Sequence, residues 1–72
     1  MRISYDAEVD ALYIRLIEGK HQCRTMRVTD EVSLNIAEGE VLVGIEILQA
    51  SHTLGHHVPP TVILENVQAI QT

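Results

Sequence analysis

The sequence has few aromatic residues and only one cysteine. Its 72 residues include Tyr5 and Tyr13 but neither Trp nor Phe, so the core has to be built from aliphatic side chains. We expect both tyrosines at the rim of that core, with their hydroxyls near water. A single Cys23 cannot form an intrachain disulfide, which excludes the disulfide-stapled class of small secreted proteins. Apolar residues still make up 46% of the chain, which predicts one folded domain over residues 1–72 rather than disorder.

Basic residues and long apolar runs are also scarce. Five Lys and Arg stand against ten Asp and Glu, and the resulting net charge of −5 argues against a nucleic-acid partner. No apolar run approaches the roughly 20 residues that cross a bilayer, so we expect no membrane partner. Asp6, Glu8 and Asp10 occupy the stretch where a signal peptide needs apolar residues. These features together predict a cytoplasmic protein.

Apolar and polar residues alternate in short runs that are separated by turn signals. Stretches with this period of two recur every eight to twelve residues. Such a pattern is typical of an antiparallel β-meander of about five strands. The predicted strands cover residues 2–5, 11–17, 21–29, 32–37 and 41–48. The strand over 21–29 is polar on both faces and is predicted at an edge, whereas the strand over 41–48 is mostly apolar and is predicted at the centre. Glu18-Gly19-Lys20 and Glu38-Gly39-Glu40 are predicted hairpin loops.

The C-terminal third has to cover the apolar face of this sheet. Residues 50–54 predict a short helix that ends at Gly55. After Pro59-Pro60, Thr61 can cap a second helix that places Ile63, Val67 and Ile70 on one side. The β-branched residues at 62–64 favour a last strand instead, and the spacing favours the helix, which we predict over residues 61–70. The expected fold class is therefore α+β, with one or two short C-terminal helices.

Three histidines form the first candidate site. His52 and His56 stand four residues apart, a spacing that lets two imidazoles share a metal on one helix face, and His57 follows directly. A third ligand can come from His57, from His21 or from Cys23, and the last two residues also form a candidate nucleophile pair. This cluster gives the alternative function, a small metal-dependent enzyme or metal-binding protein. The other interpretation is a solvated polar loop, because Gly55 is expected to end the helix before His56.

Three carboxylates form the second candidate site. Asp6, Asp10 and Glu46 can perform acid–base chemistry or hold a hard cation if their side chains converge. Structural roles explain the same residues. The two aspartates flank a turn, where they can accept hydrogen bonds from backbone N–H groups, and Glu46 can pair with Arg15 across two strands.

Two stretches of the chain resemble the YuzE-like family of bacterial proteins. The first is Tyr5-Asp6 followed by Asp10-Ala11-Leu12-Tyr13-Ile14-Arg15-Leu16, and the second is Val43-Gly44-Ile45-Glu46-Ile47-Leu48. The likeness runs over about residues 3–51 and leaves 52–72 as a C-terminal extension. Ala7 stands where the family often has proline. By this resemblance the candidate motif residues are Tyr5, Asp6, Asp10, Tyr13, Gly44 and Glu46.

The resemblance implies a small bacterial domain that has no established activity, so we assign no catalytic residue and expect no cofactor. Some relatives look like the antitoxin half of toxin–antitoxin pairs. In addition, a 72-residue domain with an exposed edge strand tends to complete itself by association. We therefore predict a non-enzymatic protein-interaction module that forms a homo-oligomer, with a toxin-like neighbour as the candidate protein partner.

Overall fold

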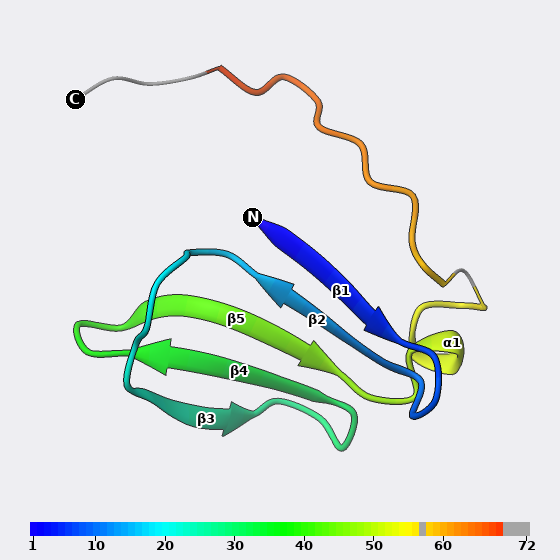
Figure 1. Ribbon diagram of the computed structural model, residues 1–72, viewed down its shortest axis with the longest axis horizontal. Helices are drawn as coiled ribbons and strands as arrows, with labels where there is room; N and C mark the ends of the chain where they lie inside the picture. The colour runs from blue at the N-terminus through cyan, green and yellow to red at the C-terminus, as the bar shows by residue number, and fades with distance from the viewer. Residues whose placement is uncertain (57, 69–72) are drawn as a thin grey trace.

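A computed structural model describes residues 1–56 and 58–68 and shows a single five-stranded antiparallel sheet (Figure 1). The strands are β1 (Arg2–Asp6), β2 (Ala11–Arg15), β3 (Cys23–Arg27), β4 (Val32–Ala37) and β5 (Val41–Ile47). Their order across the sheet is β1-β2-β5-β4-β3. The predicted five-stranded antiparallel sheet is thus confirmed, with the polar strand β3 at an edge and the apolar strand β5 in the centre.

The connection between β2 and β3 differs from the prediction. A hairpin at Glu18-Gly19-Lys20 would pair these two strands, but β2 pairs with β1 and β5, and β3 pairs with β4. Residues 16–22 instead run along one end of the sheet, past β5 and β4 (Figure 1). This distance is three strand spacings, about 14 Å, which a tight hairpin loop cannot span. The strands β3, β4 and β5 form a meander, to which the β1–β2 hairpin is added through β5.

The strand register gives the sheet one apolar and one polar face. A row of cross-strand neighbours on the first face contains only apolar residues: Ile3, Ile14, Ile45, Leu34 and Met26. The adjacent row on the same face contains Tyr5, Leu12, Ile47 and Val32. On the opposite face the neighbours are mainly polar: Ser4, Tyr13, Glu46, Ser33 and Arg27. The alternation in the sequence therefore becomes a division between two faces.

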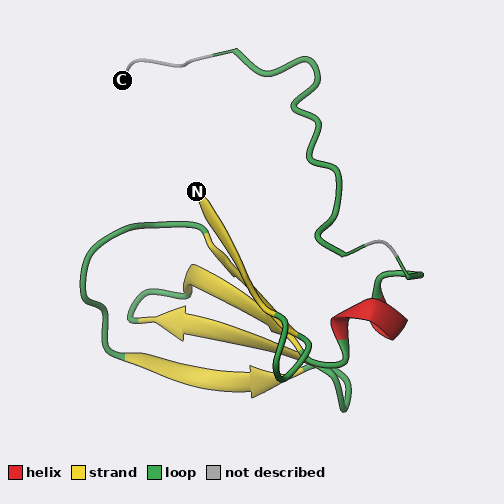
Figure 2. Cartoon of the chain, turned by 45° about the vertical axis from the view of Figure 1, so that its right-hand side comes forward, coloured by secondary structure: helices red, strands yellow, loops and turns green. Residues whose placement is uncertain are grey.

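The main buried cluster lies at the α1 end of the apolar face, and two further buried residues, Ile36 and Val43, lie farther along β4 and β5. Leu12, which is 1% exposed, forms a buried cluster with Ile47 and Ala50, and Leu54 and Val58 pack against it. Ala50 begins α1 (Ala50–Thr53), a single turn of helix beside the end of the sheet (Figure 2). The predicted helix end at Gly55 is confirmed by its positive φ of 67°. In the described part of the chain, no helix has the length and apolar character needed to cross a membrane.

The second predicted helix is not formed in the described residues. The chain from 61 to 68 adopts neither helix nor strand, and every residue in it is exposed. Figure 1 shows this segment running away from the sheet, beyond β1. A helix of this length is only marginally stable unless it packs against another element, and every residue of this segment is exposed. The remaining position of the predicted helical stripe, Ile70, lies outside the described residues.

Candidate functional site

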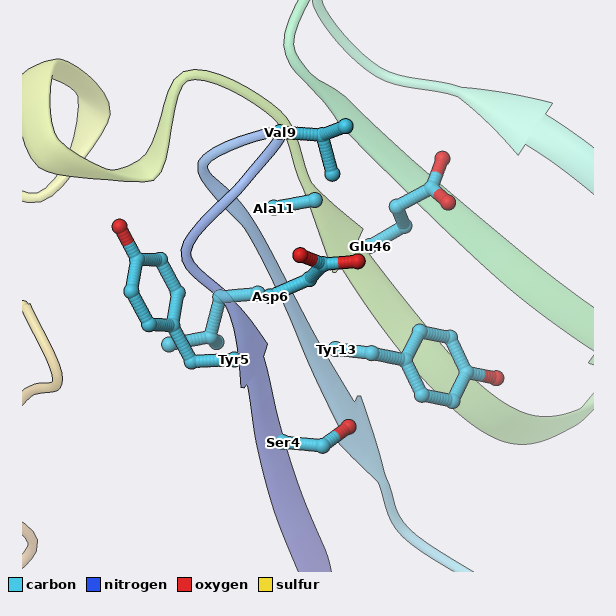
Figure 3. A pocket seen from close by; sticks show the side chains of 8 residues that line it. Ser4, Tyr5, Asp6, Val9, Ala11, Tyr13 and Glu46 are labelled. Atoms are coloured by element: carbon cyan, nitrogen blue, oxygen red, sulfur yellow. The ribbon is translucent and has the colours of Figure 1, made fainter.

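An open hollow of about 240 Å³ lies beside the β1–β2 turn (Figure 3). Its lining residues come from β1, β2, β5 and the turn: Ser4, Tyr5, Asp6, Val9, Ala11, Leu12, Tyr13 and Glu46. Four of the six motif residues that the sequence singles out are among them. Ligands usually bind in concave sites that carry a few polar groups. The geometry of these side chains therefore decides whether they can act together on a ligand or a cation.

The two carboxylates of the hollow do not converge. In Figure 3 the carboxylate of Asp6 is directed toward the aliphatic stem of Glu46, while the carboxylate of Glu46 extends away from Asp6. Asp6 Oδ1 accepts a hydrogen bond from the backbone N–H of Glu8 at 3.0 Å, which is the turn-stabilising role predicted for it. Among the described residues, no group of three or more His, Cys, Asp or Glu side chains is placed to hold a metal ion.

The predicted ion pair between Arg15 and Glu46 is wrong. Arg15 stands opposite Gly44 in the β2–β5 register, and Glu46 stands opposite Tyr13. The guanidinium of Arg15 turns to the β2–β3 connection instead, where its Nε lies 3.8 Å from Glu18 Oε2 and its Nη2 donates to the carbonyl of Gly19. The two residues are therefore diagonal neighbours, offset by two residues in the register, and the Arg15 side chain has partners in the β2–β3 connection instead.

Asp10 is placed away from the hollow and ties the β1–β2 turn to α1. Its Oδ1 accepts a hydrogen bond from the Tyr5 hydroxyl at 2.7 Å and one from the Ser51 backbone N–H at 3.1 Å. Its Oδ2 accepts a hydrogen bond from the Ser51 hydroxyl at 2.6 Å, and its carbonyl accepts one from the N–H of Ala50 at 2.9 Å. Asp10 thus satisfies the first N–H groups of a helix 40 residues further along the chain.

These hydrogen bonds shift two pKa values in opposite directions. The hydroxyl of Ser51 and then that of Tyr5 stabilise the charged carboxylate, which lowers the pKa of Asp10 below its ordinary value. Because the Tyr5 hydroxyl donates to that carboxylate, the pKa of Tyr5 is raised above its ordinary value, and the negative charge of Asp10 disfavours the phenolate further. The pair is therefore held as a carboxylate and a neutral phenol.

We expect the fold to lose stability in acid and in alkali through this pair. Because the folded pKa of Asp10 is lowered, its contribution is present above the ordinary value of 3.8 and is lost as the pH falls through the folded value. Because the folded pKa of Tyr5 is raised, its contribution is present below 10.0 and is lost as the pH rises through the folded value.

Thermal unfolding midpoints measured against pH test this prediction. Wild type should be more stable than Asp10→Asn at neutral pH, and the gap should narrow as the pH falls below 3.8. Asp30→Asn, the same change on an exposed residue of the β3–β4 turn, should leave the wild-type profile intact. A gap that stays constant into acid would contradict the role given to the Asp10 carboxylate.

Tyr13 and Gly44 form a second structural pair on the polar face. The Tyr13 hydroxyl accepts a hydrogen bond from Asn35 Nδ2 at 2.8 Å, which carries the ring across β5. A Cβ added at Gly44 would lie 2.5 Å from Tyr13 Cζ, closer still to the hydroxyl oxygen, and 3.1 Å from the carbonyl oxygen of Ile14. Glycine is therefore required at position 44 by the close approach of the tyrosine ring.

The histidines are only partly brought together. The rings of His52 and His56 meet edge to face, with their centroids 6.4 Å apart. His56 follows Gly55, after the end of α1, and its backbone N–H donates to the Ser51 carbonyl at 2.6 Å. His57 lies outside the described residues, so its place in the predicted cluster is not described. The described pair offers two exposed imidazoles, one in α1 and one just after it.

The predicted pairing of Cys23 with His21 is not formed. Cys23 is exposed, and its thiol lies 3.5 Å from the backbone carbonyl of His21. The imidazole Nε2 of His21 lies 2.8 Å from the carbonyl of Glu18 instead. The thiol has no described imidazole base beside it.

Ser51 and Asn35 are the residues that sequence analysis missed. A helix start near residue 50 leaves backbone N–H groups that need an acceptor, which signals that a partner exists. Nothing in the local pattern identifies that acceptor as Asp10, because the two residues are 41 positions apart. Likewise, Asn35 meets Tyr13 only through the order of the strands.

The fold and its hydrogen-bonded motifs define a small antiparallel-sheet domain in which most of the motif residues have structural partners. The family model described as "Protein of unknown function (DUF2283)" matches residues 2–51, which include all five strands and Ser51. The chain belongs to this family. No curated protein and no solved structure matches the chain.

Proposed function

We propose that this domain is a protein-interaction module that binds an extended segment of a partner protein at the free edge of β3. The observation that carries the proposal is the exposure of β3, which is the outermost strand and has all five residues exposed. An edge strand presents a row of N–H and C=O groups onto which another strand can add. The other edge strand, β1, has half-buried residues at alternate positions and is less open.

The ladder between β3 and β4 defines which groups of β3 face outward. The N–H of Val28 donates to the carbonyl of Val32 at 2.8 Å, so this pair is hydrogen-bonded. Hydrogen-bonded and non-hydrogen-bonded pairs alternate in an antiparallel ladder. The N–H groups of Thr25 and Arg27 therefore point to the free edge, where an added strand would meet them.

The charge of this edge indicates the kind of segment that fits. Arg24 and Arg27 of β3, together with Lys20 in the connection before it, are three of the five basic residues in a chain of net charge −5. Glu40 already holds Arg24 in an ion pair of 2.7 Å. An extended segment with acidic side chains is the best complement to the remaining positive charge. The resemblance to YuzE-like proteins extends the proposal to a toxin-like partner whose gene adjoins that of this chain.

A proline substitution on the outward side of β3 tests the proposal. Proline is tolerated on an edge strand where its missing N–H faces solvent, so Thr25→Pro should fold while losing one donor to the partner. Binding of the neighbouring gene product, measured by calorimetry, should weaken by about tenfold or more in Thr25→Pro. Thr25→Ala keeps the N–H and should bind within about twofold of wild type.

The outcomes of this experiment separate the two parts of the proposal. Equal affinities for Thr25→Pro and wild type would reject the β3 edge as the binding surface. No binding of the neighbouring gene product by the wild-type chain would reject the toxin-like partner. Circular dichroism of Thr25→Pro has to match wild type, because a lost sheet would also reduce binding.

A further inference from the structure

The apolar face of the sheet is most fully buried toward its two ends, at Leu12 and Ile47 near α1 and at Ile36 and Val43 farther along β4 and β5. The row nearer to α1 contributes the buried residues Leu12 and Ile47. The next row, called here the open row, consists of Ile3, Ile14, Ile45, Leu34 and Met26. Its first four residues are half-buried, and Met26 is 41% exposed. The described structure therefore leaves an apolar strip across all five strands with incomplete cover.

The same chain carries an exposed apolar segment without a described partner surface. In residues 61–68, Ile63 is 76% exposed, Leu64 is 75% exposed and Val67 is 69% exposed. Glu65 is the one charged residue of the segment. Contiguous exposed apolar side chains of this kind mark an interaction surface. The chain thus has an open apolar row and an apolar segment that are not in contact with each other.

The path of the chain directs the segment away from its own sheet. Val58 packs against the core cluster, and Pro59-Pro60 follow directly. Two consecutive prolines restrict the backbone, which limits how sharply the chain can turn back onto the sheet. Figures 1 and 2 both show residues 61–68 separated from the strands. When extended, the segment spans about 26 Å, and the open row across five strands spans about 19 Å.

The chain exposes more area than a fully packed chain of its size, and the segment 61–68 contributes to this surplus. The chain exposes 5877 Å², whereas a folded chain of its 8.0 kDa is expected to expose about 4,400 Å². The excess is about 1,500 Å², and a stable protein–protein interface removes about 800 Å² from each partner. The surplus surface is therefore large enough for a stable dimer.

We infer that residues 61–68 of one copy cover the open row of a second copy, and that the second copy does the same in return. Such an exchange has two-fold symmetry and closes at two chains. Each chain carries a charge of −5, so long-range electrostatics oppose the dimer and apolar burial has to drive it. Added salt should therefore strengthen the association. The inference uses the apolar face of the sheet, including the Met26 side chain, whereas the proposed function uses the outward backbone groups of β3.

Sedimentation equilibrium of the untagged full chain tests the inference. Wild type should dimerise, and Ile63→Asp and Leu64→Asp should each raise the dimer Kd by about tenfold or more. Both residues are exposed in the single chain, so these variants should fold like wild type. Val9→Asp, a charge placed on an exposed valine of the β1–β2 turn, should leave Kd within about twofold of wild type.

Mixing two defective variants tests the exchange itself. Ile63→Asp keeps an intact open row, and Met26→Asp keeps an intact segment. A mixed dimer therefore regains one complete contact that neither variant has alone. Native mass spectrometry of an equimolar mixture should show the mixed dimer above the half of all dimers that random pairing would give.

Three results would overturn the inference. The first is a chain that stays monomeric at every concentration, and the second is a mixture that shows no preference for the mixed dimer. The third is a dimer whose Kd is unchanged by Ile63→Asp and by Leu64→Asp. If that third dimer is weakened by Thr25→Pro, the chains pair through β3, and the proposed binding edge survives without the exchange.

Discussion

Gly44→Ala is expected to lower the free energy of unfolding by about 2–4 kcal/mol. The new Cβ would overlap the ring of Tyr13, and overpacking of this kind costs about 1–3 kcal/mol. Moving the ring away also breaks the 2.8 Å hydrogen bond from Asn35, which adds about 0.5–1.5 kcal/mol. In a domain of this size the unfolding midpoint should fall by roughly 10 °C or more.

Two comparison variants identify the cause of that loss. Gly39→Ala introduces the same methyl group at a turn where nothing lies within 4 Å, so only the positive φ of 79° opposes it. This variant should cost about 1 kcal/mol. In the double variant Gly44→Ala/Tyr13→Ala, the overlap disappears because the ring is absent. The two single effects should therefore sum to more than the double effect, and strict additivity would show that Tyr13 is not what excludes a side chain at position 44.

Sequence periodicity predicted the positions of the strands more reliably than the pairing between them. Alternation shows which side chains share a face, and it places β1 to β5 within a few residues of their observed bounds. It carries no information on which strand pairs with which. The hairpin expected at Glu18-Gly19-Lys20 follows from the assumption that consecutive strands pair. In the structure, β5 lies between β2 and β4, which covers both edges of the most apolar strand.

The candidate site shows the same division between local and long-range information. The resemblance points to Tyr5, Asp10, Tyr13 and Gly44, and the structure gives each of them a partner. Asp10 is hydrogen-bonded to Tyr5 from the adjoining turn, but the other partners of Asp10, and those of Tyr13 and Gly44, come from other strands or from α1, so no local pattern could supply them. The motifs are explained largely by what holds β1, β2, β5 and α1 together. This leaves the edges, the open row and the exposed segment as the surfaces on which an interaction can act.

The second helix failed as a prediction for a physical reason that also bears on association. The spacing of Ile63 and Val67 is that of an amphipathic helix, whose stability comes mainly from packing its apolar face. In the single chain, residues 61–68 are exposed and adopt neither helix nor strand. The inferred exchange would bury this exposed apolar segment against the open row of a second copy.

Leu12→Ala is expected to have the largest effect of all single substitutions considered. Leu12 is 1% exposed and lies between Ile47 and Ala50, where the sheet meets α1. Removing a buried leucine side chain costs about 2–5 kcal/mol, and a chain of this length has a total stability of roughly 4–11 kcal/mol. The variant should therefore be partly or wholly unfolded at 37 °C.

Urea unfolding at one fixed protein concentration measures this effect, since association would shift the apparent stability. Leu12→Met keeps the volume of the side chain and should cost less than about 1.5 kcal/mol. Leu48→Ala truncates a leucine that is 36% exposed just after β5 and should cost about 1 kcal/mol or less. If the alanine variants at 12 and 48 were equally stable, the core would not be centred beneath α1. The Asp10–Ser51 link would then fix the helix to a surface that contributes little to folding.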